Sequence, residues 1–255
     1  MSRYEEPDLS GLYHLHTSNL RARVAAPGGD EDLRPFRFRT YPGASRTPLP
    51  GRDFDLPVDF GRVLAGRSSV REFELRLLEL EKLGRLLHAS YGVAGSRQVD
   101  GVTAYARPTP SAGGLYPLEL YVVCQSVAEL PAGLYHYDAR AHELEQRRVA
   151  SLHVALADLT IGQEMIRDAV AVIVITAVFQ RTMWKYGQRG YRYVWLDAGH
   201  VAQNTYLVAG ALGLGAVSIG GFFDRELDEL LLLPAEEHAV YLVCVGHPRG
   251  AASSS

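Results

Sequence analysis

The chain has 255 residues, of which 47% are hydrophobic and 22% charged, a balance typical of a soluble globular enzyme. Its net charge of −3, from 26 basic and 29 acidic side chains, gives no reason to expect nucleic acid or a membrane as a partner. No apolar run is long enough to span a bilayer and no signal peptide is recognisable, so we expect a cytoplasmic protein. Cys124 and Cys244 lie in apolar runs, so we expect both thiols to be buried and reduced, and no zinc spacing or other metal site is recognisable.

Residues 1–58 hold seven of the 13 prolines. Because proline removes a backbone donor and forbids long helices, this stretch should be mostly extended or irregular, an extension packed on the core. A short helix is expected in "GLYHLHTSN" at 11–19. We expect one domain from 59 to 250, followed by a disordered tail at 251–255.

The first half of this domain mixes helices and strands. A short helix and a polar loop are expected over 58–73, followed by a helix in "ELRLLELEKLGRLLHASYG" at 74–92, where apolar residues recur with helical spacing and Gly92 provides a stop. The segments 118–127 and 133–148 are rich in residues that favour strands, and a turn at 131–133 joins them.

The second half continues without regular alternation of strands and helices. "AVAVIVITAVF" at 169–179 is dominated by β-branched residues and predicts a strand buried on both faces. "RYVWLDAGHVAQNTYLVAGALGLG" at 192–215 predicts a long helix whose small residues allow close approach of another helix. One or two helices over 150–169, a diglycine segment at 216–223, a helix at 224–233 and a strand at 238–250 complete the pattern. This order indicates an α+β layered fold, not a doubly wound nucleotide-binding fold.

Two glycine-containing stretches are candidate ligand contacts. Before the strand at 118–127, "PSAGG" offers open backbone N–H groups, and its glycines permit positive φ and close approach of a flat ligand; its residues are Pro110, Ser111, Ala112, Gly113 and Gly114. A turn leading into the strand would explain the same residues. "SIGG" repeats the pattern late in the chain with Ser218, Ile219, Gly220 and Gly221.

A third candidate contact is the loop "GRSSVREF" at 66–73. Its two arginines and two hydroxyls could bind a phosphate through charge-assisted hydrogen bonds; they are Arg67, Ser68, Ser69 and Arg71. A surface loop whose serines cap a helix is the alternative. Together with the two glycine patches, the loop suits a flat, phosphorylated cofactor such as FMN.

The combined motifs resemble the nitroreductase-like FMN flavoprotein superfamily, and within it the SagB-like azoline dehydrogenase branch. Arg67, Ser69, Arg71 and Phe73 match the superfamily's Arg-x-Ser-x-Arg/Lys-aromatic signature. The branch's own signatures are similar to "PSAGGLYP" at 110–117, "GLYHYD" at 133–138, "RGYRYVWLDAGHVAQN" at 189–204 and "LGLGAVSIGGF" at 212–222. The resemblance covers the chain from about residue 60 onward. It implies a central, mostly antiparallel sheet flanked by helices, and an intertwined homodimer with FMN at the subunit interface.

The resemblance also implies roles for individual residues. Arg67 and Ser69, with Ser68 beside them, should hold the phosphate and ribityl chain, and Arg71 should approach the N1/O2 edge of the ring. The stretches 110–114 and 218–221 should line the flavin, with the Gly220 amide facing N5. Arg249 is a further candidate phosphate contact.

Lys185 and Tyr186 form a Lys-Tyr pair that the azoline oxidases share and that is taken as their proton-handling element. The chain has two lysines against 24 arginines, and lysine, unlike arginine, can lose its proton. Burial beside a flavin would lower the pKa of Lys185 and suit it to act as a general base. An exposed loop lysine is the alternative.

The implied activity is an FMN-dependent dehydrogenase, or oxidase, that converts peptide-borne thiazoline or oxazoline rings to thiazole or oxazole. Hydride would pass to flavin N5, Lys185 and Tyr186 would handle the proton, and O2 would reoxidise the flavin. The substrate would be carried on a peptide or carrier protein, and a cyclase or synthetase is a candidate partner. Two alternatives remain open: an NAD(P)H-dependent nitro- or quinone reductase on the same fold, and a non-catalytic flavin-binding scaffold subunit.

Asp197 and His200 lie one turn apart on the predicted long helix. They could form a polar network beneath the flavin or a hydrogen-bonded set at a dimer interface.

Overall fold

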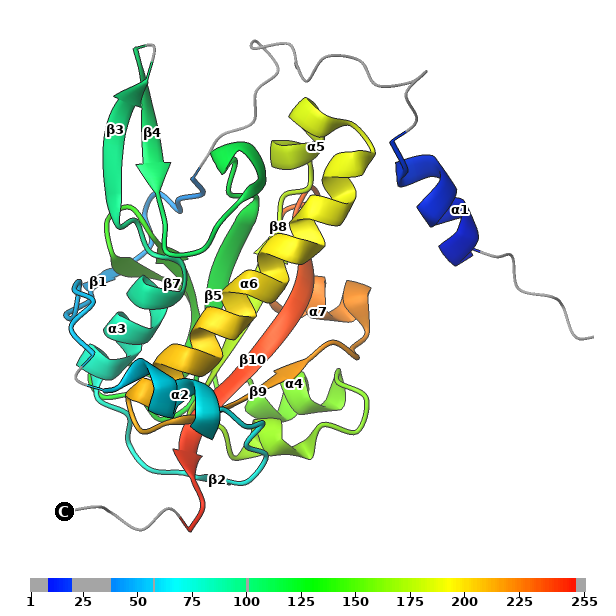
Figure 1. The fold of residues 1–255 in the computed structure, drawn as a ribbon. Coiled ribbons are helices and arrows are strands. Elements are labelled where there is room, and N and C mark those ends of the chain that lie inside the picture. The colour runs from blue at the N-terminus through cyan, green and yellow to red at the C-terminus, as the bar shows by residue number, and fades with distance from the viewer. Residues whose placement is uncertain (1–8, 20–37, 57, 100, 251–255) are drawn as a thin grey trace, which may run out of the picture.

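The computed structural model describes residues 9–19, 38–56, 58–99 and 101–250, and its main body is built around one large sheet (Figure 1). The strands of this sheet are β1 (Arg46–Pro48), β2 (Phe73–Glu74), β5 (Leu118–Cys124), β6 (Gly133–Asp138), β7 (Glu143–Val149), β8 (Ala171–Ala177), β9 (Gly215–Ile219) and β10 (His238–Pro248). Their order is β1-β7-β6-β5-β8-β10-β2, with β9 also paired to β10. All of these pairings are antiparallel, which confirms the predicted sheet type.

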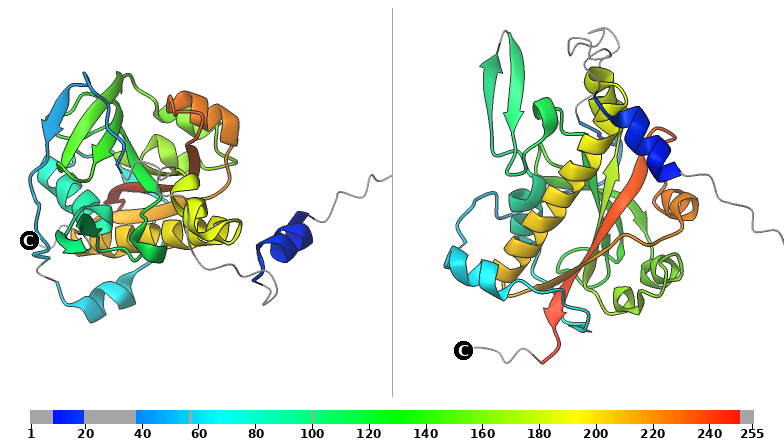
Figure 2. Two further views of the ribbon diagram at one scale, coloured as in Figure 1. Left: turned by 90° about the horizontal axis from the view of Figure 1, so that it is seen from above. Right: turned by 45° about the vertical axis from the view of Figure 1, so that its right-hand side comes forward.

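The middle of the sheet is fully buried. Every residue of β8 is inaccessible, as the run of valine and isoleucine predicts, because β8 lies between β5 and β10. Helices cover both faces of the sheet (Figures 1 and 2).

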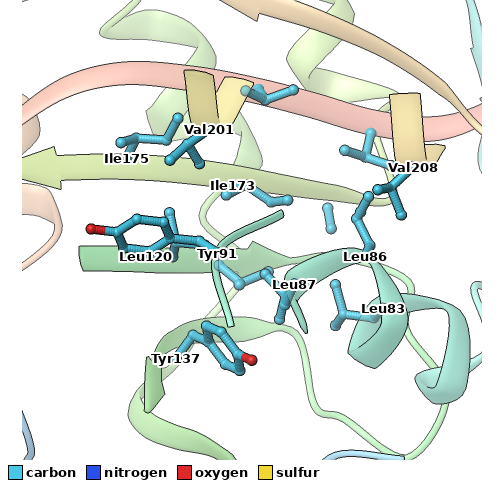
Figure 3. Packing of buried hydrophobic residues seen from close by; sticks show 14 of the residues in the cluster. Leu83, Leu86, Leu87, Tyr91, Leu120, Tyr137, Ile173, Ile175, Val201 and Val208 are labelled. Atoms are coloured by element: carbon cyan, nitrogen blue, oxygen red, sulfur yellow. The ribbon is translucent and has the colours of Figure 1, made fainter. Parts of the chain in front are cut away.

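One face carries the two longer helices, α3 (Leu80–Tyr91) and α6 (Arg189–Ala211). Leu86 and Val201 from these helices pack on Ile173 of the sheet in one apolar cluster (Figure 3). The opposite face carries α4 (His153–Asp158), the short 3-10 helix η3 (Glu164–Arg167) and α7 (Asp224–Leu230). Successive residues of a strand point to opposite faces, so β5 and β8 supply side chains to both clusters.

The helix predicted from residue 74 begins only at residue 80. Phe73 and Glu74 instead pair with β10, and Leu78 forms a bridge to Val127. Apolar residues at 75, 77 and 78 fit the helical spacing, but sheet pairing decides their backbone.

The sequence analysis missed several elements. These are the hairpin of β3 (Gly95–Val99) and β4 (Val102–Ala106), the helix α5 (Gln180–Tyr186) and the strand character of β1, β2 and β9. The short helix α2 (Phe60–Gly66) and the two separate helices over 150–169 agree with expectation.

The N-terminal part contacts the body at several places, among them α1 and β1. The helix α1 (Leu9–Thr17) contacts α6, where Arg192 donates to the Thr17 hydroxyl at 2.6 Å. β1 pairs with the edge strand β7. The predicted tail at 251–255 and most of the predicted extension before residue 38 lie outside the described residues.

The structure also bears on the cysteines and on the length of the helices. Cys124 and Cys244 are free and buried, as expected. In the described part of the chain, no helix has the length and apolarity needed to cross a bilayer.

A group of charged side chains is buried on the face that α4 and α7 cover. His136 lies between two carboxylates, with Nδ1 2.9 Å from Glu145 and Nε2 3.4 Å from Glu119. Burial lowers the pKa of His136, but these two hydrogen-bonded carboxylates outweigh it and raise the pKa to about 9. His136 is therefore a cation at neutral pH and holds β5, β6 and β7 together.

The raised pKa makes stability depend on pH. The contribution of protonated His136 is complete below its unfolded pKa of 6.5 and is lost as the pH rises through about 9. We expect His136→Gln to lower the free energy of unfolding by about 1–3 kcal/mol at pH 6 and to flatten its decline above pH 6.5.

Urea unfolding at a series of pH values measures this effect, and His153→Gln is the matched control. Burial lowers the pKa of His153 to about 4, so this residue stays neutral over the same range. A decline as steep in His136→Gln as in the unmodified protein would contradict the assignment.

Candidate functional site

The loop before β5 has the backbone geometry that its glycines allow. Residues Ala112–Gly114 form a 3-10 turn, η2, and both Gly113 and Gly114 have φ of 63°. A Cβ placed on Gly113 would lie 2.7 Å from the Tyr186 hydroxyl and 3.4 Å from Lys185 Nζ. Gly113 therefore suits the positive φ of this turn, and the ends of the Tyr186 and Lys185 side chains lie beside its backbone.

Lys185 and Tyr186 lie at the end of α5, which stops at Gly187. Both side chains are half-buried, and the Tyr186 ring meets the edge of Tyr193 from α6 at 5.2 Å between centroids. The structure thus brings together the predicted proton-handling pair and the first glycine patch, although 72 residues of chain separate Gly113 from Lys185.

Ser111 anchors this loop to α6. Its hydroxyl donates to the Asp197 carboxylate at 2.6 Å and accepts from the Tyr116 amide at 2.9 Å. Burial raises the pKa of Asp197 to about 6, while hydrogen bonds from Ser111 and the Ala112 amide oppose the rise. The Ser111 hydroxyl is occupied within the protein, so the surface that the loop offers a ligand is mainly its backbone.

A second cluster forms around Tyr206 of α6. Its hydroxyl lies 3.2 Å from Ser69 Oγ and accepts from the Ser218 amide at 2.7 Å, and the Arg67 guanidinium stands 5.6 Å over its ring. The amide of Val70 also donates to the carbonyl of Ala216 at 2.9 Å. These bonds hold the predicted phosphate loop against β9, and Arg67 and Ser68 line a cavity there of about 170 Å³.

The other predicted contacts lie at several places near the two clusters. Arg71 is exposed, and Ile219 is buried, so only its backbone is available to a ligand. Gly220 and Gly221 follow β9, and the Gly221 carbonyl accepts from the Ile161 amide. Arg249 contacts the Phe73 carbonyl at 3.2 Å and the Asp168 carboxylate at 3.6 Å, in partly exposed positions. Pro110 is exposed at the start of the first glycine patch.

The two clusters are separate within one chain. Asp197 anchors the first and Tyr206 the second, and these two residues are nine positions apart on α6. An α-helix rises 1.5 Å and turns about 100° per residue, so these anchors are about 14 Å apart along the axis and on opposite sides of the helix. The predicted residues therefore form two half-sites, one bonded to Asp197 and the other to Tyr206.

Comparison with known proteins settles the family. The model described as "Nitroreductase family" matches residues 64–247, well over half of the chain. The chain belongs to the nitroreductase family. This membership supports the expected oxidoreductase class and confirms the superfamily that the sequence motifs resemble.

Three relatives of this nitroreductase-family protein differ in how much they share with it. The protein MJ1384 of Methanocaldococcus jannaschii, described as a nitroreductase, is 40% identical over 72% of this chain and 88% of its own length. The trifolitoxin-processing protein TfxB of Rhizobium leguminosarum bv. trifolii is 32% identical over 46% of this chain and 34% of its own. The microcin B17-processing protein McbC of Escherichia coli is 30% identical over 54% of this chain and 52% of its own. Relatives of the SagB-like kind are thus present, and the chain aligns with about a third and a half of their lengths.

Solved structures bear out the fold. A protein of Anabaena variabilis described as a nitroreductase has a TM-score of 0.78 and 30% identity, covering 92% of this chain and 45% of that one. A chain of the Escherichia coli microcin synthetase McbBCD complex, with truncated pro-MccB17 bound, has a TM-score of 0.60 and 20% identity, covering 93% and 91%. At 20% identity the second likeness concerns the fold alone.

Tyr206 and Arg62 are site residues that the sequence analysis missed. Tyr206 fell within the predicted long helix, and its role depends on Ser69, 137 residues away, so no local pattern marks it. Arg62 lines the same cavity as Arg67 and lies five residues before it, on α2. Asp197 was noted as polar, but its partner in the glycine loop was not foreseen.

The double role of the Ser111 hydroxyl leads to a stability prediction. Ser111→Ala leaves the Asp197 carboxylate and the Tyr116 amide without this partner, so the free energy of unfolding should fall by about 1–3 kcal/mol. Ser96→Ala, at an exposed position on β3, is the matched control and should change it by less than about 0.5 kcal/mol. Denaturant unfolding at pH 7.5 compares the two; equal small effects would mean that Ser111 does not anchor the loop.

Proposed function

We propose that this protein is an FMN-dependent dehydrogenase that converts peptide-borne thiazoline or oxazoline rings to thiazole or oxazole. The observation that carries the proposal is the contact of Lys185 and Tyr186 with the bare backbone of Gly113. That contact puts an amine and a phenol beside a surface against which a flat ring could lie. The relatives named for trifolitoxin and microcin B17 processing support a peptide substrate.

The residues present fit FMN. Arg67 and Ser69 offer a guanidinium and a hydroxyl for a phosphate, and Ser218 Oγ is buried without a hydrogen-bond partner in the part of the chain that the structure describes. The glycine loop adds a flat backbone surface without side chains. The flavin contacts expected at Ser68, Arg71, Gly220, Gly221 and Arg249 belong to the same proposal.

A homodimer would bring the two half-sites together. Within one chain they are separated by α6, so we propose that the Arg67 cluster of one subunit faces the Gly113 loop of its partner. The outward side of α6 supports self-association, because Trp195 and Leu196 are 41% and 59% exposed there. A Cβ on Gly199 would meet no atom within 4 Å, so this position would allow a second helix to approach closely.

The chain's own residues then have defined tasks. Oxidation of an azoline removes one hydride and one proton, and bound FMN supplies the two-electron acceptor, which O2 regenerates with formation of hydrogen peroxide. The Lys185 amine takes the proton from the ring carbon, assisted by the Tyr186 hydroxyl. The Gly113–Gly114 backbone, held by Ser111 and Asp197, fixes the surface against which the rings align.

A second candidate is an NAD(P)H-dependent nitro- or quinone reductase. It is favoured by the 40% identity with MJ1384, which extends over more of this chain than the matches to TfxB and McbC. Such an enzyme would bleach its flavin rapidly with NADPH and would not need Lys185. A partner cyclase is proposed from the likeness to a chain of the McbBCD complex, and a scaffold without turnover is the remaining alternative.

Lys185→Ala separates these functions. The variant should retain its bound flavin absorbance but lose oxidation of an azoline-containing peptide by about 10²–10⁴-fold, measured as loss of two hydrogens by mass spectrometry. Lys82→Ala, on α3, is the control and should leave turnover unchanged. Undiminished product with Lys185→Ala would rule out the base assignment, and rapid bleaching by NADPH would favour the reductase.

Complementation tests whether the site spans two subunits. Arg67→Ala and Lys185→Ala should each be inactive alone, but a mixed dimer would contain one site with both natural residues. Random mixing makes half of the dimers mixed, so co-expressed variants should recover about a quarter of the unmodified activity. No recovery, despite mixed dimers shown by native mass spectrometry, would place Arg67 and Lys185 of the same chain in each site.

A further inference from the structure

Helix α5 contacts both ends of the segment 113–119, which runs from the glycine loop into the start of β5. At one end, Arg181 Nη2 lies 2.6 Å from the Glu119 carboxylate, and at the other Lys185 and Tyr186 meet Gly113. Arg181 and Lys185 are four residues apart and therefore lie on the same side of α5, one turn from each other. The helix is thus fixed to residues 113–119 at two points about 6 Å apart along its axis.

The Arg181–Glu119 pair is fully buried, since each side chain is 4% exposed. Burial would raise the pKa of Glu119, but Arg181 and His136 outweigh it and hold the pKa at about 2, so the pair is ionic at neutral pH. Nε and Nη1 of Arg181 are buried and bond to none of the described residues, so this guanidinium relies on Glu119. A buried ion pair is seldom more stabilising than apolar side chains of equal size, and a positional role would account for it better.

Glu119 is itself held from two other directions. Its Oε1 accepts from the Arg39 amide at 2.9 Å, and its Oε2 lies 3.4 Å from His136 on β6. These contacts hold the Glu119 carboxylate in place on β5. Its ion pair with Arg181 then helps to hold α5 in place relative to that strand.

Helix α5 also makes close contacts with α6. Phe179, next to the first turn of α5, stacks on Tyr191 at 4.7 Å, and a Cβ on Gly190 would lie 2.9 Å from Cα of Met183. These contacts hold the helix against α6. The start of α5 is tied to the residues before β5 by the Val178 amide, which donates to the Pro117 carbonyl at 2.9 Å, and the ion pair adds a side-chain link to β5 from the first turn of the helix.

We propose that Arg181, through its ion pair with Glu119, is a positioning residue that holds Lys185 and Tyr186 against the Gly113 loop. Arg181 acts through α5 and touches no reacting atom. The catalytic importance of this position rests on the proposed function, but the position itself does not. Loss of the ion pair should free the end of α5 and leave Lys185 more accessible.

The chain offers a direct readout, because Lys82 and Lys185 are its two lysines. Acetylation of the full-length protein with an N-hydroxysuccinimide ester, followed by peptide mass spectrometry, gives the rate for Lys185 relative to that for Lys82. Arg181→Met and Glu119→Gln should each raise this ratio by about threefold or more, since local opening exposes the amine. Arg181→Lys, which keeps the charge, should restore much of the original ratio, and its added lysine lies on an identifiable peptide.

Arg39→Met is the matched control. It breaks a different ion pair of the same buried group, between Arg39 and Glu237, and should lower stability without changing the Lys185 ratio. An unchanged ratio in Arg181→Met, or an equal rise in Arg39→Met, would overturn the proposal. If Arg181→Met does not fold, Glu119→Gln gives the same comparison.

Turnover separates this inference from the proposed function. With an azoline peptide, Arg181→Met should lower kcat by about tenfold or more with little change in KM, because misplacement of a catalytic group affects mainly the chemical step. A raised acetylation ratio together with full activity of Lys185→Ala would leave the positioning role standing and reject the azoline chemistry. A lowered kcat with an unchanged ratio would reject the positioning role and leave that chemistry standing.

Discussion

The contact between the backbone of Gly113 and the side chains at the end of α5 is the constraint on which the candidate site depends. Any side chain at Gly113 would meet the Tyr186 hydroxyl, and the loop could not keep its positive φ without strain. The loop is held from the other side by Asp197 of α6. The end of α5 and the Asp197 side chain of α6 therefore meet the same short loop, in which Ser111 supplies the anchoring side chain and the two glycines supply backbone alone.

Helix α6 is the second organising element, since it belongs to both half-sites. Its inner side packs on the sheet through Val201 and Val208 and also carries Asp197, one turn before Val201, whereas Tyr206 lies on the opposite side. The helix therefore keeps the groups around Asp197 and Tyr206 apart within one chain. Its exposed apolar residues Trp195 and Leu196 suggest how a second copy would complete the arrangement.

The sequence predicted the features that depend on residues close together along the chain. The apolar run of β8, the length of α6 and the glycine turn at 113–114 follow from composition and spacing, and the family motifs gave the fold. Residues 74–79 were assigned wrongly because pairing with β10 overrides their helical spacing. Helix α5 was missed because two turns without a repeating apolar pattern are stable only through tertiary packing.

Contacts between distant segments had no such local signal. Tyr206 and the buried group around Glu119 depend on partners from other strands and helices. A single glutamate within an apolar strand does not by itself predict a buried ion pair. The division of the predicted cofactor residues into two half-sites likewise follows from their placement around α6, which residue spacing along the chain does not reveal.

The burial of both thiols has a consequence for an enzyme that would generate hydrogen peroxide at its own centre. Peroxide attacks the thiolate form of cysteine, and burial raises the pKa of Cys124 and of Cys244, so that neither thiol ionises at neutral pH. Both lie within the central strands, where no solvent reaches the sulfur. If the proposed oxidase activity is correct, hydrogen peroxide formed in turnover would not convert these two cysteines to sulfenic acid.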